Sequence, residues 1–177
     1  MAVSTLEVRP HTVVELPAIA LAAVSRNAPI SNISIEEVDG CMIQMAHLRE
    51  KLSAKNQLLQ SESGETIVGM AIISGDIMSE DSVVEVIDGI PVSNEISLIS
   101  ELDGEADLCM SKCAEGQYIK ERHVGPYSGL KGVYQHLIDE VAPSMGLAYN
   151  GGPVVELYYV IGVDDDKLVT EVCVPVS

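Results

Sequence analysis

The chain has 177 residues, of which 47% are hydrophobic, and its 27 acidic and 10 basic residues give a formal net charge of −17. This length fits one domain or two tightly fused halves, and the apolar fraction suffices for a core without disulfides. The acidic surplus argues against sequence-independent binding to DNA or RNA, which relies on Lys and Arg at phosphates, and it favours cationic small partners.

The aromatic and sulfur-containing residues further limit the kinds of site that this chain can form. The chain has no Trp or Phe, and all six tyrosines lie between Tyr118 and Tyr159, so an aromatic-lined site is expected in the second half. The four cysteines form no CxxC pair and lack the surrounding histidines of a zinc site. We therefore expect free thiols, no metal site and no cofactor. The chain shows neither a signal peptide nor a membrane-spanning apolar run, which predicts a cytoplasmic protein.

The first half reads as strand, helix and two strands. Residues 6–25 have a strand pattern with a break near Pro17. Ser34 and Glu37 form a capping box that opens a helix, and an apolar stripe at helical spacing continues to Leu52. Residues 66–74 and 82–88 follow as a strand pair.

The second half repeats this order. We expect residues 96–100 to begin its sheet, and the acidic segment 101–116 to contain the connection. Residues 117–124 read as a strand and 130–141 as a helix that Pro143 stops. Residues 153–162 and 167–175 form the closing hairpin.

Three short similarities occur in the same order in the two halves, which indicates an internal repeat. The predicted fold is therefore α+β, with duplicated strand-helix-strand-strand modules at about residues 5–93 and 94–177 of one domain. A pseudo-twofold axis would relate the modules, with antiparallel sheets forming a concave groove and helices on the back. Such a groove is a common ligand site.

The strand near residue 156 places a carboxylate among apolar residues. Because side chains alternate along a strand, Glu156 and Tyr158 share one face, predicted to point toward the groove. Val155, Leu157 and Tyr159 share the other, predicted to lie under the helices. A buried carboxylate needs a partner. That partner is a cationic ligand or a neighbouring base such as Lys120 or Arg122; alternatively, Glu156 is exposed.

A set of motifs runs through the second half: His123-x-Gly125-Pro126-Tyr127, Tyr134, Leu137, Gly146, Pro153, Glu156-x-Tyr158 and Thr170-Glu171-x-x-x-Pro175-Val176. In combination they resemble the gyrase-inhibitor-like (GyrI-like) effector-binding family, over nearly the whole chain. The resemblance implies the duplicated effector-binding fold and a stand-alone member. It also implies that a hydrophobic, cationic small molecule binds in the groove, for effector sensing or drug sequestration.

The resemblance also implies roles for individual residues of this chain. Glu156 falls on the position that neutralises the cation, Tyr158 and Tyr127 fall on aromatic positions, and Tyr118 and Tyr134 are further candidates for the pocket lining. If the protein is an enzyme, it is implied to hydrolyse cyclopropane-containing or other electrophilic toxins with Glu156 and Tyr127. A third possibility is an acidic protein–protein inhibitor, such as of gyrase. No direct contact with nucleic acid or membrane is expected, whereas a protein partner or a homodimer is compatible with the sequence.

Overall fold

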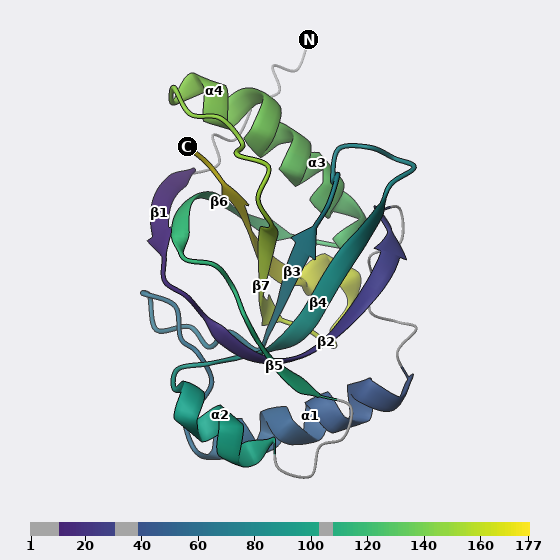
Figure 1. Ribbon diagram of the computed structural model, residues 1–177, viewed down its shortest axis with the longest axis vertical. Coiled ribbons are helices and arrows are strands. Elements are labelled where there is room, and N and C mark those ends of the chain that lie inside the picture. Colours follow the sequence, from purple (N-terminus) through teal and green to yellow (C-terminus); the bar gives the residue numbers. More distant parts are fainter. Residues whose placement is uncertain (1–10, 31–38, 103–107) are drawn as a thin grey trace.

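The computed structural model describes residues 11–30, 39–102 and 108–177 (Figure 1). Its centre is one eight-stranded sheet, in which every pairing is antiparallel and the strand order is β1-β6-β8-β7-β3-β4-β2-β5. The strands are β1 Thr12–Leu16, β2 Ala20–Pro29, β3 Gly69–Ser74, β4 Val83–Val92, β5 Cys109–Lys112, β6 Gly116–Val124, β7 Val154–Val160 and β8 Val169–Pro175. An antiparallel sheet with helices confirms the α+β class.

Helices lie at opposite ends of the molecule. In Figure 1, α1 (Asp39–Ala54) and α2 (Glu95–Glu101) lie at the bottom and α3 (Leu130–His136) at the top. A π-helical turn, Leu137–Val141, joins α3 directly to α4 (Ala142–Ser144). Short 3-10 turns lie at Tyr127–Gly129 and Asp165–Lys167.

The sheet is buried on both faces, in three hydrophobic clusters. Cluster 1 joins the sheet to the α3–α4 helical run and includes Ile73, Val86, Val133 and Leu137. Cluster 3 packs the other end of the same face against α1, through residues such as Ala22, Leu48 and Ile90. Cluster 2 lies on the opposite face, where the curved sheet gathers side chains from both of its halves, among them Leu21, Met70, Tyr118, Leu157 and Cys173.

Two elements differ from the sequence-based prediction. Residues expected to begin a strand form α2 instead, because the Asn94 side chain accepts the backbone N–H of Ile96 and caps a helix. The segment interpreted as a connection contains β5, which pairs with the edge of β2. The predicted capping box, Ser34 and Glu37, lies outside the described residues.

Pro143 does not stop the second helix where expected. The chain remains helical to Ser144, with Pro143 in the first turn of α4. A proline lacks the N–H that would continue the helical hydrogen bonding, and the helical run ends one residue after it. The π-helical turn before it, in which Ala142 N–H bonds Leu137 C=O, widens the helix at this point.

None of the helices within the described ranges combines the length and the apolar character needed to cross a bilayer.

Substitutions at two glycines can test how closely strands β2 and β4 pack. A Cβ on Gly89 of β4 would lie 2.4 Å from the Ala22 carbonyl oxygen, whereas one on Gly132 of α3 meets nothing within 4 Å. Gly89→Ala is expected to lower the free energy of unfolding by about 1–3 kcal/mol through overpacking. Gly132→Ala, the matched control, is expected to raise it by about 0.5–1 kcal/mol, because alanine favours the helix. Urea denaturation measures both, and equal effects would contradict this view of the β2–β4 contact.

Candidate functional site

Glu156 lies on the helix-bearing face of the sheet. Its neighbours on alternate positions of β7, Val154 and Tyr158, pack in cluster 1 with α3. Val155, Leu157 and Tyr159 pack in cluster 2 on the other face. The predicted alternation is confirmed, but the assignment of the faces was wrong. Both faces of this curved sheet are buried, so the apolar pattern of one strand does not reveal which face the helices cover.

The strand registers place Glu156 in a row of side chains across the sheet. It lies opposite Val172 of β8 and Ala71 of β3, and Ala71 in turn lies opposite Asp88 of β4. Two carboxylates are thus separated by one alanine, with their strands about 10 Å apart. Both are buried, Glu156 at 3% and Asp88 at 5% exposure. Ala71 and Val172 of this row belong to cluster 1, and on β4 Asp88 lies between Val86 of cluster 1 and Ile90 of cluster 3.

The two carboxylates differ in their partners. Arg26 Nε donates to Asp88 Oδ2 at 3.0 Å, which balances that charge. Glu156 accepts a hydrogen bond from the Tyr158 hydroxyl at 2.5 Å, and no Lys, Arg or His in the described part of the chain forms an ion pair with it. Of these two carboxylates, Asp88 therefore has a basic partner among the described residues and Glu156 does not.

Burial dominates the electrostatics of Glu156. Desolvation raises its pKa to about 7, the nearby Asp88 charge adds to the rise, and the hydrogen bond from Tyr158 opposes it. Burial and the Glu156 charge also raise the pKa of Tyr158 well above its usual value. The hydroxyl of Tyr158 therefore stays protonated and remains a donor, while Glu156 is poised to gain or lose a proton near neutral pH.

Three of the predicted tyrosines lie on the same face of the sheet as Glu156. The ring of Tyr127 meets that of Tyr158 edge-on, with 5.8 Å between centroids. Tyr134, on α3, is buried in the same cluster, and its hydroxyl has no hydrogen-bond partner among the described residues. Tyr118 lies in cluster 2, on the opposite face, where its hydroxyl donates to the Ala114 carbonyl. The structure therefore brings Tyr158, Tyr127 and Tyr134 to the Glu156 face and leaves Tyr118 apart.

The bases considered as partners of Glu156 pair elsewhere. Lys120 bonds Glu171, and Arg122 makes two bonds to Glu65. Both bases occupy even positions of β6 and so lie on the side of Tyr118, away from Glu156.

Sequence reasoning missed Asp88 and Arg26, and it named Thr170 only within a motif, without a role at the site. Thr170 is fully buried opposite Tyr158, and its hydroxyl oxygen has no hydrogen-bond partner in the described ranges. Asp88 had a usable signal, because it follows Val84 and Val86 at the core-facing positions of an alternating strand. A charged residue at such a position needs a partner. The structure also groups His11, Glu121 and His136, which lie far apart in the sequence.

A shallow, open depression lies elsewhere, beside α1. Its lining is Ala46, Arg49, Glu50, Ser53, Ala54, Leu58, Thr66 and Val68. It contains none of the residues around Glu156, so it is separate from the candidate site.

The structure thus combines a curved antiparallel sheet with a helix-covered face that buries a carboxylate and tyrosines. A model of the GyrI-like small molecule binding domain matches residues 9–177, and the chain belongs to this family. The resemblance predicted from the motifs is confirmed. No curated protein sequence gives a significant match.

Solved structures agree in fold over almost the full length. The crystal structure of the EcmrR C-terminal domain has a TM-score of 0.62 at 15% identity, with 96% of this chain and 98% of that chain covered. A hydrolase from Listeria innocua has a TM-score of 0.59 at 15% identity, with coverage of 96% and 92%. SAV2435 bound to tetraphenylphosphonium has a TM-score of 0.55 at 12% identity, with coverage of 95% and 94%. At these identities the likeness shows the fold.

The raised pKa of Glu156 makes a prediction about stability. Its folded value of about 7 exceeds the ordinary value of 4.5, so the folded state binds the proton more tightly. The resulting stabilisation is complete below pH 4.5 and is lost as the pH rises through about 7. Relative to Glu156→Gln, the wild type should lose on the order of 3 kcal/mol between pH 4.5 and pH 8. Denaturation of both proteins across this range tests it, and parallel pH profiles would contradict the buried, titrating carboxylate.

Proposed function

We propose that this domain binds a hydrophobic, cationic small molecule on the sheet face between α1 and α3, with Glu156 as the charge partner. The observation that carries the proposal is a carboxylate at 3% exposure, held by a tyrosine hydroxyl and with no ion-pair partner among the described residues. A charge in such surroundings is costly unless a counter-charge joins it, and a ligand cation supplies one.

Aromatic rings complete the chemistry of the proposed site. Tyr158 and Tyr127 offer two ring systems in edge-on contact beside the carboxylate. A cation over a tyrosine face is stabilised by about 0.5–2 kcal/mol, more when water is excluded. A flat or aromatic organic cation satisfies both features at once, because its charge meets Glu156 and its rings pack on the tyrosines.

Ligand entry requires movement, since Glu156 is enclosed in this structure. Tyr127 begins a three-residue 3-10 turn that buries none of its residues fully and follows Gly125, whose φ of 136° favours glycine. We infer that displacement of this turn, with Tyr127, opens the site.

We further infer that the two halves are duplicated modules related by a pseudo-twofold axis between β3 and β7. From these central strands the order runs β4-β2-β5 on one side and β8-β6-β1 on the other. The outermost strand on each side comes from the other half of the sequence. Strand β1, from the first half, pairs with β6 of the second half, and β5, from the second half, pairs with β2 of the first half. Glu156 then faces Ala71 near the axis, so the site has one acid at this position rather than two.

Two similar structures lend support. The structure of SAV2435 contains tetraphenylphosphonium, a lipophilic cation. EcmrR, whose C-terminal domain shares this fold, has also been solved with DNA, in a chain of which 59% is covered. A ligand of the tetraphenylphosphonium class is therefore a suitable first probe.

Substitution of Glu156 should weaken binding of a cation selectively. Glu156→Gln is expected to reduce the affinity for tetraphenylphosphonium by about 1–3 kcal/mol, the scale of a charged interaction, and to leave that for neutral triphenylphosphine oxide unchanged. Because the cation requires ionised Glu156, wild-type affinity should rise with pH through about 7. Isothermal titration calorimetry at pH 5.5 and 8 measures both effects.

Glu171→Gln is the matched control. Glu171 is also buried on β8 but pairs with Lys120 and Tyr159 on the opposite face, so its substitution removes the same charge without touching the site. Equal losses in the two variants would assign the effect to net charge and overturn the role of Glu156.

A second candidate function is hydrolysis of an electrophilic toxin, favoured by the pKa of about 7 of Glu156. A carboxylate with this pKa can act as a general base at neutral pH. Glu156 would take a proton from water as the water oxygen bonds to a strained-ring carbon. The broken ring bond's electron pair would pass to a conjugated acceptor oxygen, which the Tyr127 hydroxyl would stabilise.

The enzyme hypothesis predicts turnover without selectivity for charge. Incubation with an electrophilic cyclopropane compound, followed by mass spectrometry, should show addition of water at a rate that Glu156→Gln lowers at least a hundredfold while binding of the uncharged compound persists. Glu171→Gln should retain the rate. Absence of a water adduct with the wild type would reject this function and leave the binding proposal intact.

A further inference from the structure

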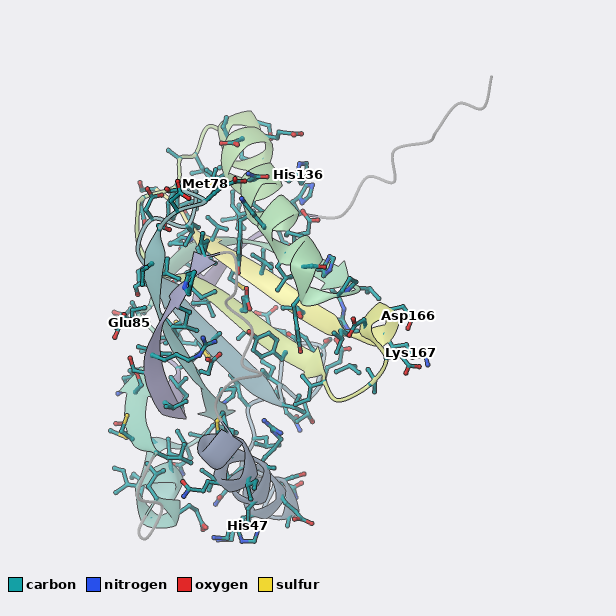
Figure 2. All side chains as sticks on the ribbon, turned by 90° about the vertical axis from the view of Figure 1, so that its right-hand side faces the viewer. His47, Met78, Glu85, His136, Asp166 and Lys167 are labelled. Carbon is teal, nitrogen blue, oxygen red and sulfur yellow. The ribbon has the colours of Figure 1, made fainter. Side chains whose placement is uncertain are left out.

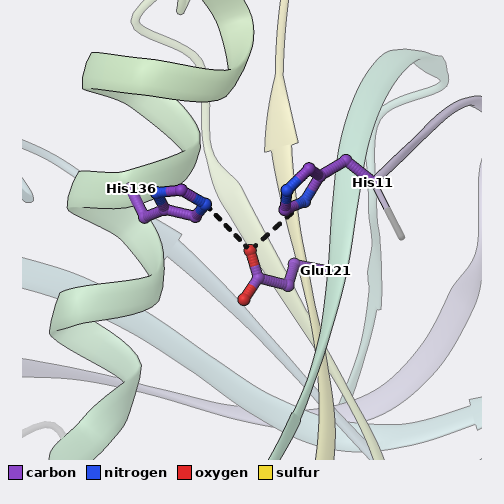
Figure 3. A group of neighbouring side chains, drawn as sticks. All are labelled: His11, Glu121 and His136. Carbon is purple, nitrogen blue, oxygen red and sulfur yellow. Dashed lines mark ion pairs between the residues drawn. The ribbon is translucent and has the colours of Figure 1, made fainter. Parts of the chain in front are cut away.

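His11, Glu121 and His136 come together from three separate elements (Figure 3). His11 immediately precedes β1, Glu121 lies on β6 and His136 ends α3. The register of β1 on β6, with Thr12 opposite Lys120, directs the residue before β1 toward Glu121. The ladder and the packing of α3 on the sheet thus fix the three backbones relative to one another.

The geometry of the three side chains is that of a metal-ligand set. His11 Nδ1 lies 3.4 Å and His136 Nε2 lies 3.9 Å from Glu121 Oε2. All three ligand atoms lie within 4.8 Å of one another. Ligands of a tetrahedral zinc ion, at about 2.0–2.2 Å from the metal, are roughly 3.4 Å apart. A small rotation of the partly exposed His136 ring would bring the set to that spacing.

Two further observations favour a metal over a simple charge cluster. The buried Nδ1 of His11 makes no hydrogen bond with any described group, although it faces the Glu121 carboxylate. The other nitrogen of His136, Nδ1, lies 3.2 Å from Glu140 Oε2. A carboxylate on the far side of an imidazole fixes the ring and holds the proton there, leaving Nε2 free to ligate.

We propose that His11, Glu121 and His136 form a binding site for a divalent transition metal ion, with zinc as the fitting ion. Two imidazoles and one carboxylate suit zinc and leave a fourth position for water. The ion would join the N-terminal strand β1 to α3 across β6.

The site is distinct from the one around Glu156. Glu121 and Glu156 lie in the same row across the sheet, each opposite Val172 of the intervening β8. Their strands are therefore about 10 Å apart, too far for one ion to bridge their carboxylates. The metal site can thus be tested independently of the proposed effector site.

The experiment uses the full chain without a polyhistidine tag, after treatment with EDTA and dialysis. Titration with Co²⁺, followed by visible absorption, and with Zn²⁺, followed by calorimetry, should show one ion per chain and a four- or five-coordinate cobalt spectrum. His136→Ala and His11→Ala should each weaken zinc binding at least tenfold, and Glu140→Gln by a smaller factor. Affinity should fall as the pH is lowered, because protons compete for the imidazoles.

His47→Ala is the matched control. His47 is exposed on α1, at the opposite end of the molecule from His136 (Figure 2). Zinc should raise the melting temperature of the wild type and of His47→Ala, but not of His136→Ala. The proposal is overturned if binding does not saturate at one ion per chain, or if loss of His47 weakens binding as much as loss of His136 or His11.

Discussion

The contact between Glu156 and the Tyr158 hydroxyl is the constraint on which the site depends. Glu156 is 3% exposed on a central strand, so its carboxylate has lost almost all of its hydration and accepts a hydrogen bond from the Tyr158 hydroxyl instead. The tyrosine compensates for part of the lost hydration, and the remaining cost appears as a pKa raised to about 7. The buried negative charge of Glu156 is therefore unfavourable, and protonation or a nearby cation would reduce this cost.

The sheet holds this arrangement in place from both sides. Cluster 2 fills the opposite face, and clusters 1 and 3 anchor the helical segments beyond the two ends of the acidic row. Asp88 and Arg26 show how a paired acid in the same row behaves, since Arg26 counteracts the effect of burial on the pKa of Asp88. The difference between these neighbouring carboxylates is the presence of a cation, and this contrast points to Glu156 as the place where a ligand charge fits.

The proposed metal site uses the same face in another way. Glu121 lies in the row with Glu156, but its neighbours are the imidazoles of His11, just before β1, and of His136 on α3, rather than tyrosine rings. One sheet face thus presents three buried acids in three settings: an arginine pair, a tyrosine hydrogen bond and a histidine pair. The group that meets the carboxylate differs in each setting: a guanidinium, a phenol hydroxyl or two imidazoles.

The sequence by itself determined the family, the α+β class, most strands and the side-by-side placement of Glu156 and Tyr158. Those features are local, because motifs, apolar periodicity and strand alternation act over a few residues. Only the tertiary structure decided which face α3 covers, that Arg122 pairs with Glu65, and that His11, Glu121 and His136 meet. These depend on strand register and helix packing between distant segments. In a sheet buried on both faces, such contacts leave no periodic trace in any one stretch of the chain.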